Sequence, residues 1–239
     1  MFFTFLQAES EVIEGVVAPV QEELSFSLID MAAKGGWLMI VLAILSVVAI
    51  YIFAERLYTI RKASKIDKNF IKDVNDYLLE GKVRSARMLC KRSESSVARM
   101  IEKGITRMDK PLQDIQTSVE NVANMEVAKL EKGLPALATI AGGAPMIGFL
   151  GTVMGMVQAF INIAQAGNNI DITLLSGGIY TAMVTTVGGL VVGILAYFGY
   201  NYLTAEVSGV VSKMESSTIE FLDAVQAKKD AAAKAAQEE

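Results

Sequence analysis

Three long stretches of apolar residues dominate the pattern along the chain. Residues 37–54 contain no charged side chain, and neither do residues 134–166 or 174–205. A helix needs about 20 apolar residues to cross the hydrocarbon core of a bilayer. The pattern therefore predicts an all-α integral membrane protein with three transmembrane helices, at residues 35–55, 134–166 and 174–205.

The second and third stretches are separated only by residues 167–173, which begin with the sequence Gly167-Asn168-Asn169. Glycine and asparagine readily adopt the backbone conformations that tight turns require. These two transmembrane helices are therefore expected to form a hairpin with a short loop.

Lysine and arginine are distributed very unevenly between the segments outside the membrane. Seventeen of them lie in residues 55–133, one lies in residues 1–34 and none lies in the loop at 164–178. Basic segments stay preferentially on the cytoplasmic side of a membrane. Residues 56–133 and 206–239 are therefore predicted to be cytoplasmic, and the N-terminus and the short loop to lie outside.

Residues 1–34 form the predicted outer, periplasmic segment, and two interpretations of it stay open. Within residues 20–33, apolar side chains recur at a helical spacing, at Val20, Leu24, Leu28 and Met31. This spacing is typical of an amphipathic helix that lies on the membrane surface. A simple lead-in to the first span is equally compatible with it.

Helix start and stop signals punctuate the basic region. Asp67 can cap a helix that ends before Gly81, and Asp109, followed by Pro111, can begin another. Between them, two short helices are expected at residues 82–92 and 96–108.

Two of the helices are expected to cross the boundary of the membrane. The helix that begins at Asp109 has no clear stop signal and is expected to continue into the second span. The third span is expected to continue through residues 206–226, so that long helices extend into a cytoplasmic helical domain. Residues 227–239 are low in complexity and are expected to form a frayed tail.

Small residues recur along one face of each hairpin helix. At 3.6 residues per turn, the stripe on the second span holds Ala141, Pro145, Gly148, Thr152, Gly155 and Ala159. The stripe on the third span holds Ala182, Thr186, Gly189, Gly193, Ala196 and Tyr200. At about 1.5 Å per residue, Thr152 and Thr186 each lie roughly 21 Å below the outer turn. They are predicted to face each other at one depth.

The stripes allow two interpretations. Small residues let transmembrane helices pack closely, and a threonine there often bonds a carbonyl of its own helix. A polar pathway is the alternative, and two features favour it. Pro145 leaves a backbone carbonyl without its helical partner in mid-span, and Thr181 and Thr185 add more hydroxyl groups than packing requires.

The composition disfavours several classes of protein. The chain has no histidine and one cysteine, Cys90, so it lacks the common ligands of zinc and the common groups of nucleophilic and acid–base catalysis. We expect no catalytic residue, metal site or cofactor, and no nucleic-acid partner. The three apolar stretches also contain no aspartate, glutamate, lysine, arginine or histidine, whereas proton relays in membranes usually need an ionisable group of this kind. If protons cross here, another chain must supply the carboxylate.

Two segments of the hairpin and one behind the first span carry a resemblance to a known family. They read Ala-Pro-Met-Ile-Gly-Phe-Leu-Gly-Thr-Val-Met-Gly-Met at 144–156, Thr-Thr-Val-Gly-Gly-Leu at 185–190 with Tyr200-Asn201 after it, and Glu-Arg-Leu at 55–57. Over about residues 35–225 the chain resembles the MotA/TolQ/ExbB proton-channel family. With three spans rather than four, the chain resembles the ExbB and TolQ branches of this family rather than flagellar MotA. It is most similar to ExbB.

The resemblance implies a function and a set of partners. Such subunits form a homopentamer that encloses a pair of single-span subunits of the ExbD or TolR type, whose membrane aspartate carries protons. The proton flow energises outer-membrane processes, such as import through a TonB-like protein, envelope maintenance or motility. The resemblance implies a multi-pass protein of the bacterial inner membrane, with Thr152 and Thr186 on the proton path and Thr181 and Thr185 beside them.

The chain departs from this family at two positions. Many ExbB proteins have a glutamate where this chain has Thr181, and a proline where it has Leu195. The missing proline implies a straighter third helix. Two other functions stay open, a structural membrane scaffold and a small-solute transporter. The transporter is disfavoured because the chain has neither an internal repeat nor a charged site in a span.

Overall fold

A computed structural model describes residues 35–67, 69–166 and 172–235. The predicted amphipathic helix at 20–33 and the turn at Gly167-Asn168-Asn169 lie outside the described residues. The described part is built from helices, and three of these are long and apolar enough to cross a membrane. The prediction of an all-α protein with three membrane-spanning helices is confirmed.

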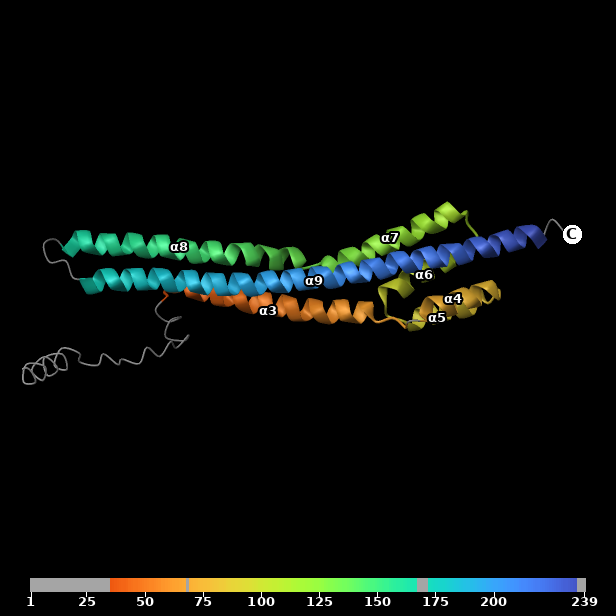
Figure 1. Cartoon of the computed structure of the whole chain (residues 1–239), viewed down its shortest axis with the longest axis horizontal. Coiled ribbons are helices and arrows are strands. Elements are labelled where there is room, and N and C mark those ends of the chain that lie inside the picture. The colour runs from red at the N-terminus through yellow and green to blue at the C-terminus, as the bar shows by residue number, and fades with distance from the viewer. Residues whose placement is uncertain (1–34, 68, 167–171, 236–239) are drawn as a thin grey trace, which may run out of the picture.

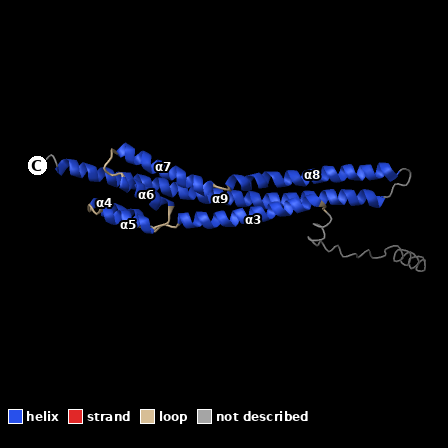
Figure 2. Cartoon of the chain, turned by 180° about the vertical axis from the view of Figure 1, so that it is seen from behind, coloured by secondary structure: helices blue, strands red, loops and turns tan. Residues whose placement is uncertain are grey.

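Three long helices run side by side along the molecule. They are α3 (Trp37–Ser64), α8 (Leu134–Ala166) and α9 (Ile172–Ala235), and α9 lies between the other two and extends the full length of the molecule (Figures 1 and 2). α3 extends beyond its apolar stretch because Ile60 and Ala63, near its end, are buried in the core. It ends where Lys65 turns to an extended conformation.

Four shorter helices form a domain around the distal half of α9. They are α4 (Phe70–Leu79), α5 (Val83–Arg92), α6 (Ser96–Thr106) and α7 (Leu112–Glu131). α7 lies on one side of α9 and α4 and α5 lie on the other, while α6 packs against both α7 and α9 (Figure 1).

The ends of these helices agree with the sequence signals only in part. Gly81, with φ of 78°, follows the end of α4, and Ser95 caps α6 by accepting a hydrogen bond from the Ala98 amide at 3.2 Å. Asp67 is not the cap of α4, which begins after Asn69. α7 begins after Pro111 rather than at Asp109, because proline supplies a suitable φ and needs no amide partner at a helix start.

The expected continuous helix from α7 into the second span is wrong. α7 ends at Glu131 and α8 begins at Leu134, and between them Gly133 has φ of 88°. Glycine adopts this left-handed conformation without the steric cost that a Cβ atom would bring, and so it commonly ends helices. The glycine, with Pro135 two residues later, is the stop signal, and it separates the span from the helical domain.

α9 continues without interruption from the span into the helical domain. It passes Leu195 without a break, as the absence of a proline there implies, and it continues well beyond residue 226. The expected frayed tail is therefore wrong up to Ala235, because alanine and lysine are strong helix formers. Only the last few residues lie outside the described part.

The helical domain contains the larger share of the buried core. Phe221 of α9 is fully buried, and a Cβ atom on Gly104 of α6 would lie 2.5 Å from its ring. Gly104 therefore makes the space that the ring occupies. In the spans the large side chains mostly point outward, and Met146 (73% exposed) and Phe198 (69% exposed) are examples. Such an apolar surface fits contact with lipid or with other membrane helices.

Candidate functional site: the hairpin of α8 and α9

The two hairpin helices are in contact through their backbones. A Cβ atom on Gly189 of α9 would lie 2.6 Å from the Ala144 carbonyl oxygen and 2.8 Å from the Gly148 Cα atom. A Cβ atom on Gly155 of α8 would lie 2.8 Å from the Ala182 Cβ atom. Side chains larger than these would push the helices apart, since real Cβ atoms do not approach so closely. The small-residue stripes therefore meet at this contact.

Gly193 covers the proline of α8. A Cβ atom on Gly193 would lie 2.5 Å from the Pro145 ring and 3.0 Å from the Ala141 carbonyl oxygen. Because proline has no amide hydrogen, the Ala141 carbonyl lacks its usual helical donor. The backbone of α9 lies directly over this freed carbonyl. Ala196, the next small residue of the stripe on α9, is buried.

Three small residues of the contact were missed in the sequence. At the loop end, a Cβ atom on Gly178 would lie 2.7 Å from the Ala159 Cβ atom, and Ala144 lies against Gly189 in mid-span. Gly151 packs against the Thr185 side chain, and a Cβ atom on Gly151 would lie 2.7 Å from the Thr185 Cβ atom. Each of the three fits the same three-to-four-residue spacing, which was the available signal.

The threonines bond to carbonyl oxygens, and one of these bonds joins the two helices. Thr186 Oγ1 donates to the Gly148 carbonyl oxygen across the hairpin at 3.1 Å. Thr185, which is 2% exposed, donates to the Ala182 carbonyl oxygen at 2.8 Å.

Thr152 does not pair with Thr186 as expected. Its Oγ1 atom donates to the Phe149 carbonyl oxygen within α8 at 2.6 Å, and the side chain is half-buried. Thr186 instead lies against Gly148, one turn away, because the glycine leaves room for its hydroxyl to reach a carbonyl. Thr181 lies one turn from Thr185, and it is also half-buried.

The hairpin offers acceptors and hydroxyls but no carboxylate, amine, guanidinium or imidazole. The hydroxyls of Thr152, Thr185 and Thr186 each donate to a carbonyl and still have lone pairs that can accept a hydrogen bond. The sequence places no aspartate, glutamate, lysine, arginine or histidine in 134–166 or 174–205. The hairpin alone can therefore hold a water molecule or a donor from another chain, but it has no carboxylate or imidazole that could relay a proton near neutral pH.

A buried carboxylate lies beneath the membrane-spanning part of the hairpin. Glu126 of α7 is 3% exposed, and its carboxylate accepts hydrogen bonds from Arg99 Nε at 2.9 Å, Lys129 Nζ at 2.8 Å and Ser96 Oγ at 3.2 Å. Burial by itself raises the pKa of Glu126, but the hydrogen bonds from Arg99 and Lys129 outweigh it and hold the pKa below its ordinary value.

This group of charges joins three helices just below α8. Arg99 and Ser96 belong to α6 and Glu126 to α7, while Arg56 of α3 donates to the Lys129 carbonyl oxygen at 3.2 Å. No pattern in the sequence indicates this group, because Glu126 lies 27 positions from Arg99 and 30 from Ser96. Among the described residues, no three histidine, cysteine, aspartate or glutamate side chains come together to hold a metal ion.

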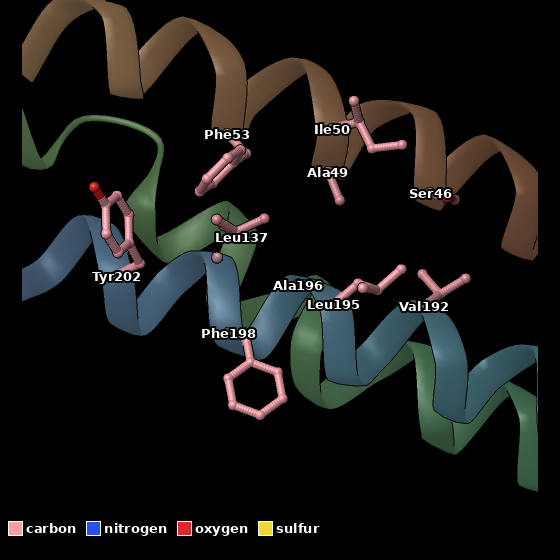
Figure 3. Close-up of a pocket in the computed structure, with 11 residues that line it drawn as sticks. Ser46, Ala49, Ile50, Phe53, Leu137, Val192, Leu195, Ala196, Phe198 and Tyr202 are labelled. Carbon is pink, nitrogen blue, oxygen red and sulfur yellow. The ribbon is translucent and has the colours of Figure 1, made fainter.

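An apolar groove lies on the opposite side of α9, between α9 and α3. Its volume is about 400 Å³. Phe53 and Ala49 of α3 face Ala196 and Val192 of α9 across it, and Leu137 of α8 closes its base (Figure 3). Unlike the α8–α9 contact, this part of the span is not closed by packing.

These features define a multi-pass α-helical membrane protein with a tightly packed, charge-free hairpin above a helical domain. Residues 92–216, slightly more than half of the chain, match the model of the MotA/TolQ/ExbB proton channel family. The chain belongs to this family, and the predicted resemblance is confirmed.

Individual relatives carry ExbB and TolQ names. The chain is 26% identical over 190 residues to a putative biopolymer transport protein ExbB homolog of Methanothermobacter thermautotrophicus, covering 79% of this chain and 67% of the relative. It is 40% identical over 85 residues to the biopolymer transport protein ExbB of Neisseria gonorrhoeae (36% and 38% covered). It is 36% identical over 87 residues to the Tol-Pal system protein TolQ of Haemophilus influenzae (36% and 38% covered).

The family and the three apolar helices agree on the class of protein. The chain is a multi-pass inner-membrane protein and a proton-channel-type subunit, and its family is not a class of enzymes. The matched region, residues 92–216, contains α7, α8 and the membrane-spanning part of α9. The hairpin therefore lies wholly within the part of the chain that is typical of the family.

Proposed function

We propose that the chain is the channel-forming subunit of an inner-membrane motor that converts proton-motive force into mechanical work. The observation that supports this most is the α8–α9 hairpin, in which Thr186 bonds across to Gly148 within spans free of carboxylates, basic side chains and histidine. Thr152 and Thr186 are then the polar positions on the proton path, with Thr181 and Thr185 beside them.

Because the hairpin has no carboxylate of its own, a partner chain would have to supply one. A proton relay in a membrane usually needs a carboxylate or histidine that binds and releases protons, and the hairpin has neither. A single-span subunit of the ExbD or TolR type, with an aspartate in the membrane, would supply the carboxylate. The relatives named ExbB and TolQ support this type of partner.

A homopentameric ring would give that partner a place to bind. The side chains of α8 and α9 that do not meet in the hairpin are large, apolar and exposed, with Phe149 at 66% and Met183 at 63%. In a ring, part of this surface would contact neighbouring subunits and part would face lipid. The partner would occupy the centre.

Such a motor could perform one of two kinds of work. Energised import through a TonB-like protein is favoured by the relatives named biopolymer transport protein ExbB. A TolQ-like role in maintaining the envelope is supported by the similarity to TolQ of Haemophilus influenzae. A structural scaffold is the remaining alternative, because the hydroxyls of Thr152, Thr185 and Thr186 are each bonded to a carbonyl.

Purification of the complex from native membranes tests this proposal. The tagged chain should co-purify, in mild detergent, with a single-span protein whose apolar segment contains an aspartate, and mass spectrometry identifies it. Replacing that aspartate by asparagine should leave the complex intact and stop its proton flux. Isolation of the chain as an oligomer of itself alone, from membranes where it is expressed at its natural level, would favour the scaffold.

A further inference from the structure

The groove between α3 and α9 has the length of about one leaflet. It runs along the helices from Ser46 and Val192 at one end to Phe53 and Tyr202 at the other (Figure 3). At about 1.5 Å per residue, these seven to ten positions span roughly 10–15 Å, or about half of a hydrocarbon core of about 30 Å. The Phe53 end lies toward the helical domain.

The groove is open to the side, and α3 and α9 approach each other closely beyond its loop end and beside Phe53. Toward the loop, a Cβ atom on Gly188 would lie 3.0 Å from the Met39 sulfur atom. Toward the helical domain, a Cβ atom on Gly199 would lie 3.0 Å from the Phe53 ring. Since α3 and α9 touch at both places, the groove cannot admit another helix, whose diameter is about 10–12 Å. It fits a thinner apolar chain.

A second hollow continues from the first and is basic. Its volume is about 650 Å³, and it shares Phe53 with the groove. It begins where the apolar stretch of α3 ends, and its charged lining consists of Arg61, Lys62, Lys65 and Glu94. The groove therefore lies at the depth of the lipid acyl chains. The basic hollow lies directly next to it, at the depth of the lipid headgroups.

Two of the three cations in this hollow have no carboxylate partner. Lys62 forms an ion pair with Glu94 at 2.7 Å. Arg61 Nη2 donates only to the Tyr202 hydroxyl, at 3.4 Å, and in the described part of the chain no carboxylate lies within 4 Å of Arg61 or Lys65. Both side chains are exposed.

We propose that the α3–α9 groove and the basic hollow together bind one anionic phospholipid, from the leaflet next to the helical domain. An acyl chain would lie in the groove between Ala49 and Ala196, and the phosphate would lie against Arg61 and Lys65. Basic pockets beside transmembrane helices bind anionic headgroups in this way. The site is separate from the α8–α9 hairpin, and it does not depend on proton conduction.

Native mass spectrometry of the purified full-length complex tests the site. Delipidated complex is mixed with palmitoyl-oleoyl phosphatidylglycerol or with the zwitterionic phosphatidylcholine of the same chains. The phosphatidylglycerol should be retained preferentially. Two neutralising changes, Arg61→Gln with Lys65→Gln, should lower its retention about tenfold or more and should leave phosphatidylcholine unchanged. The matched control is Lys72→Gln with Arg84→Gln, two exposed cations of α4 and α5.

A change within the groove tests the acyl chain. Ser46→Phe fills the groove from α3 and should displace the bound phosphatidylglycerol, whereas Val47→Phe, on the exposed face of the same helix (67% exposed), should not. Equal retention of the two lipids, or unchanged retention in the Arg61→Gln, Lys65→Gln variant, would overturn the proposal. Efficient cross-linking between Ser46→Cys and Leu195→Cys of different chains would show that a second copy covers the groove, and would also overturn it.

Discussion

Glycine at a few positions sets how closely α8 and α9 approach each other. Gly189 lies against the Ala144 carbonyl, and Gly193 lies against the Pro145 ring. Gly142 belongs to the same helix as Pro145, but nothing lies within 4 Å of the place where its Cβ atom would be. The chain therefore contains its own comparison between a glycine that packs and one that does not.

Gly189→Ala should destabilise the hairpin, whereas Gly142→Ala should not. The added methyl group at Gly189 must displace the backbone of α8, which costs about 1–3 kcal/mol for overpacking. At Gly142 the same change adds helix propensity and is expected to be neutral or stabilising by up to about 1 kcal/mol. Thermal unfolding of the purified variants in one detergent measures both. Equal midpoints for the two variants would mean that the α8–α9 contact is wrongly described.

For single residues, the sequence predicted which side chains lie on the meeting faces of α8 and α9 better than it predicted which of them touch. The 3.6-residue period placed Gly148, Gly155 and Gly193 on the faces that meet, because close packing leaves a visible pattern of small residues. The period could not show that Thr186 bonds to Gly148 rather than facing Thr152. That choice depends on the rotation and the offset of the two helices, which spacing within one helix does not determine. The roles of the threonines in proton transfer remain predictions.

Among the elements, α7 and α8 are separate helices joined at Gly133, and charged groups hold α7 in place. Glu126 connects α7 to Arg99 of α6, and Lys129 connects it to Arg56 of α3. Sequence signals within single helices located most of the ends, but they missed the break at Gly133. They could not locate the Glu126 group, because it depends on how α6 packs against α7.

The charged group predicts a dependence of stability on acid. The pKa of Glu126 is lowered in the folded protein, so the unfolded chain binds the proton more readily. The stabilisation is therefore complete above the ordinary glutamate pKa of about 4.3, and it is lost as the pH falls through the lowered value. Glu126→Gln should cost about 1–3 kcal/mol at pH 7 and should flatten the acid dependence of unfolding.

A neighbouring glutamate provides the control for this change. Glu120 is exposed on the same helix, and Glu120→Gln should leave both the stability and its acid dependence nearly unchanged. Unfolding midpoints of the purified complex between pH 3 and pH 7 give the comparison. The same acid dependence in the Glu126→Gln variant as in the unchanged chain would show that Glu126 does not stabilise the joint between α6 and α7.

On the scale of the whole molecule, the orientation in the membrane follows from charge. The basic residues lie on the side of the helical domain, so we propose that the N-terminus and the hairpin loop are periplasmic and the C-terminus cytoplasmic. A cysteine placed at Asn169 should then react with a membrane-impermeant thiol reagent added to intact spheroplasts, and Met88→Cys should react only after the membrane is opened. Met88 is 61% exposed in the helical domain.

Native Cys90 gives little background in this measurement and cannot report on orientation. It is 2% exposed, and burial raises the pKa of its thiol to about 12, so almost none of it is the reactive thiolate. Labelling of Met88→Cys in sealed spheroplasts, with Asn169→Cys protected, would reverse the proposed orientation.

In the proposed motor, the hydroxyls of the hairpin take part in proton movement and do not only pack. The most direct measurement is potential-driven proton uptake by vesicles that contain the purified complex with its partner, followed with a pH-sensitive dye. Thr186→Val with Thr152→Val keeps the side-chain volume and removes the hydroxyls. Thr139→Val, at an exposed position on α8 where the hydroxyl bonds only to Pro135, is the control.

We expect a normal complex and a proton flux at least about tenfold lower in the double variant, because losing one polar contact at the limiting step costs about 1–3 kcal/mol. The Thr139→Val complex should conduct normally. Full proton flux in the Thr152→Val, Thr186→Val complex, at the same yield and composition as the unchanged complex, would contradict the account.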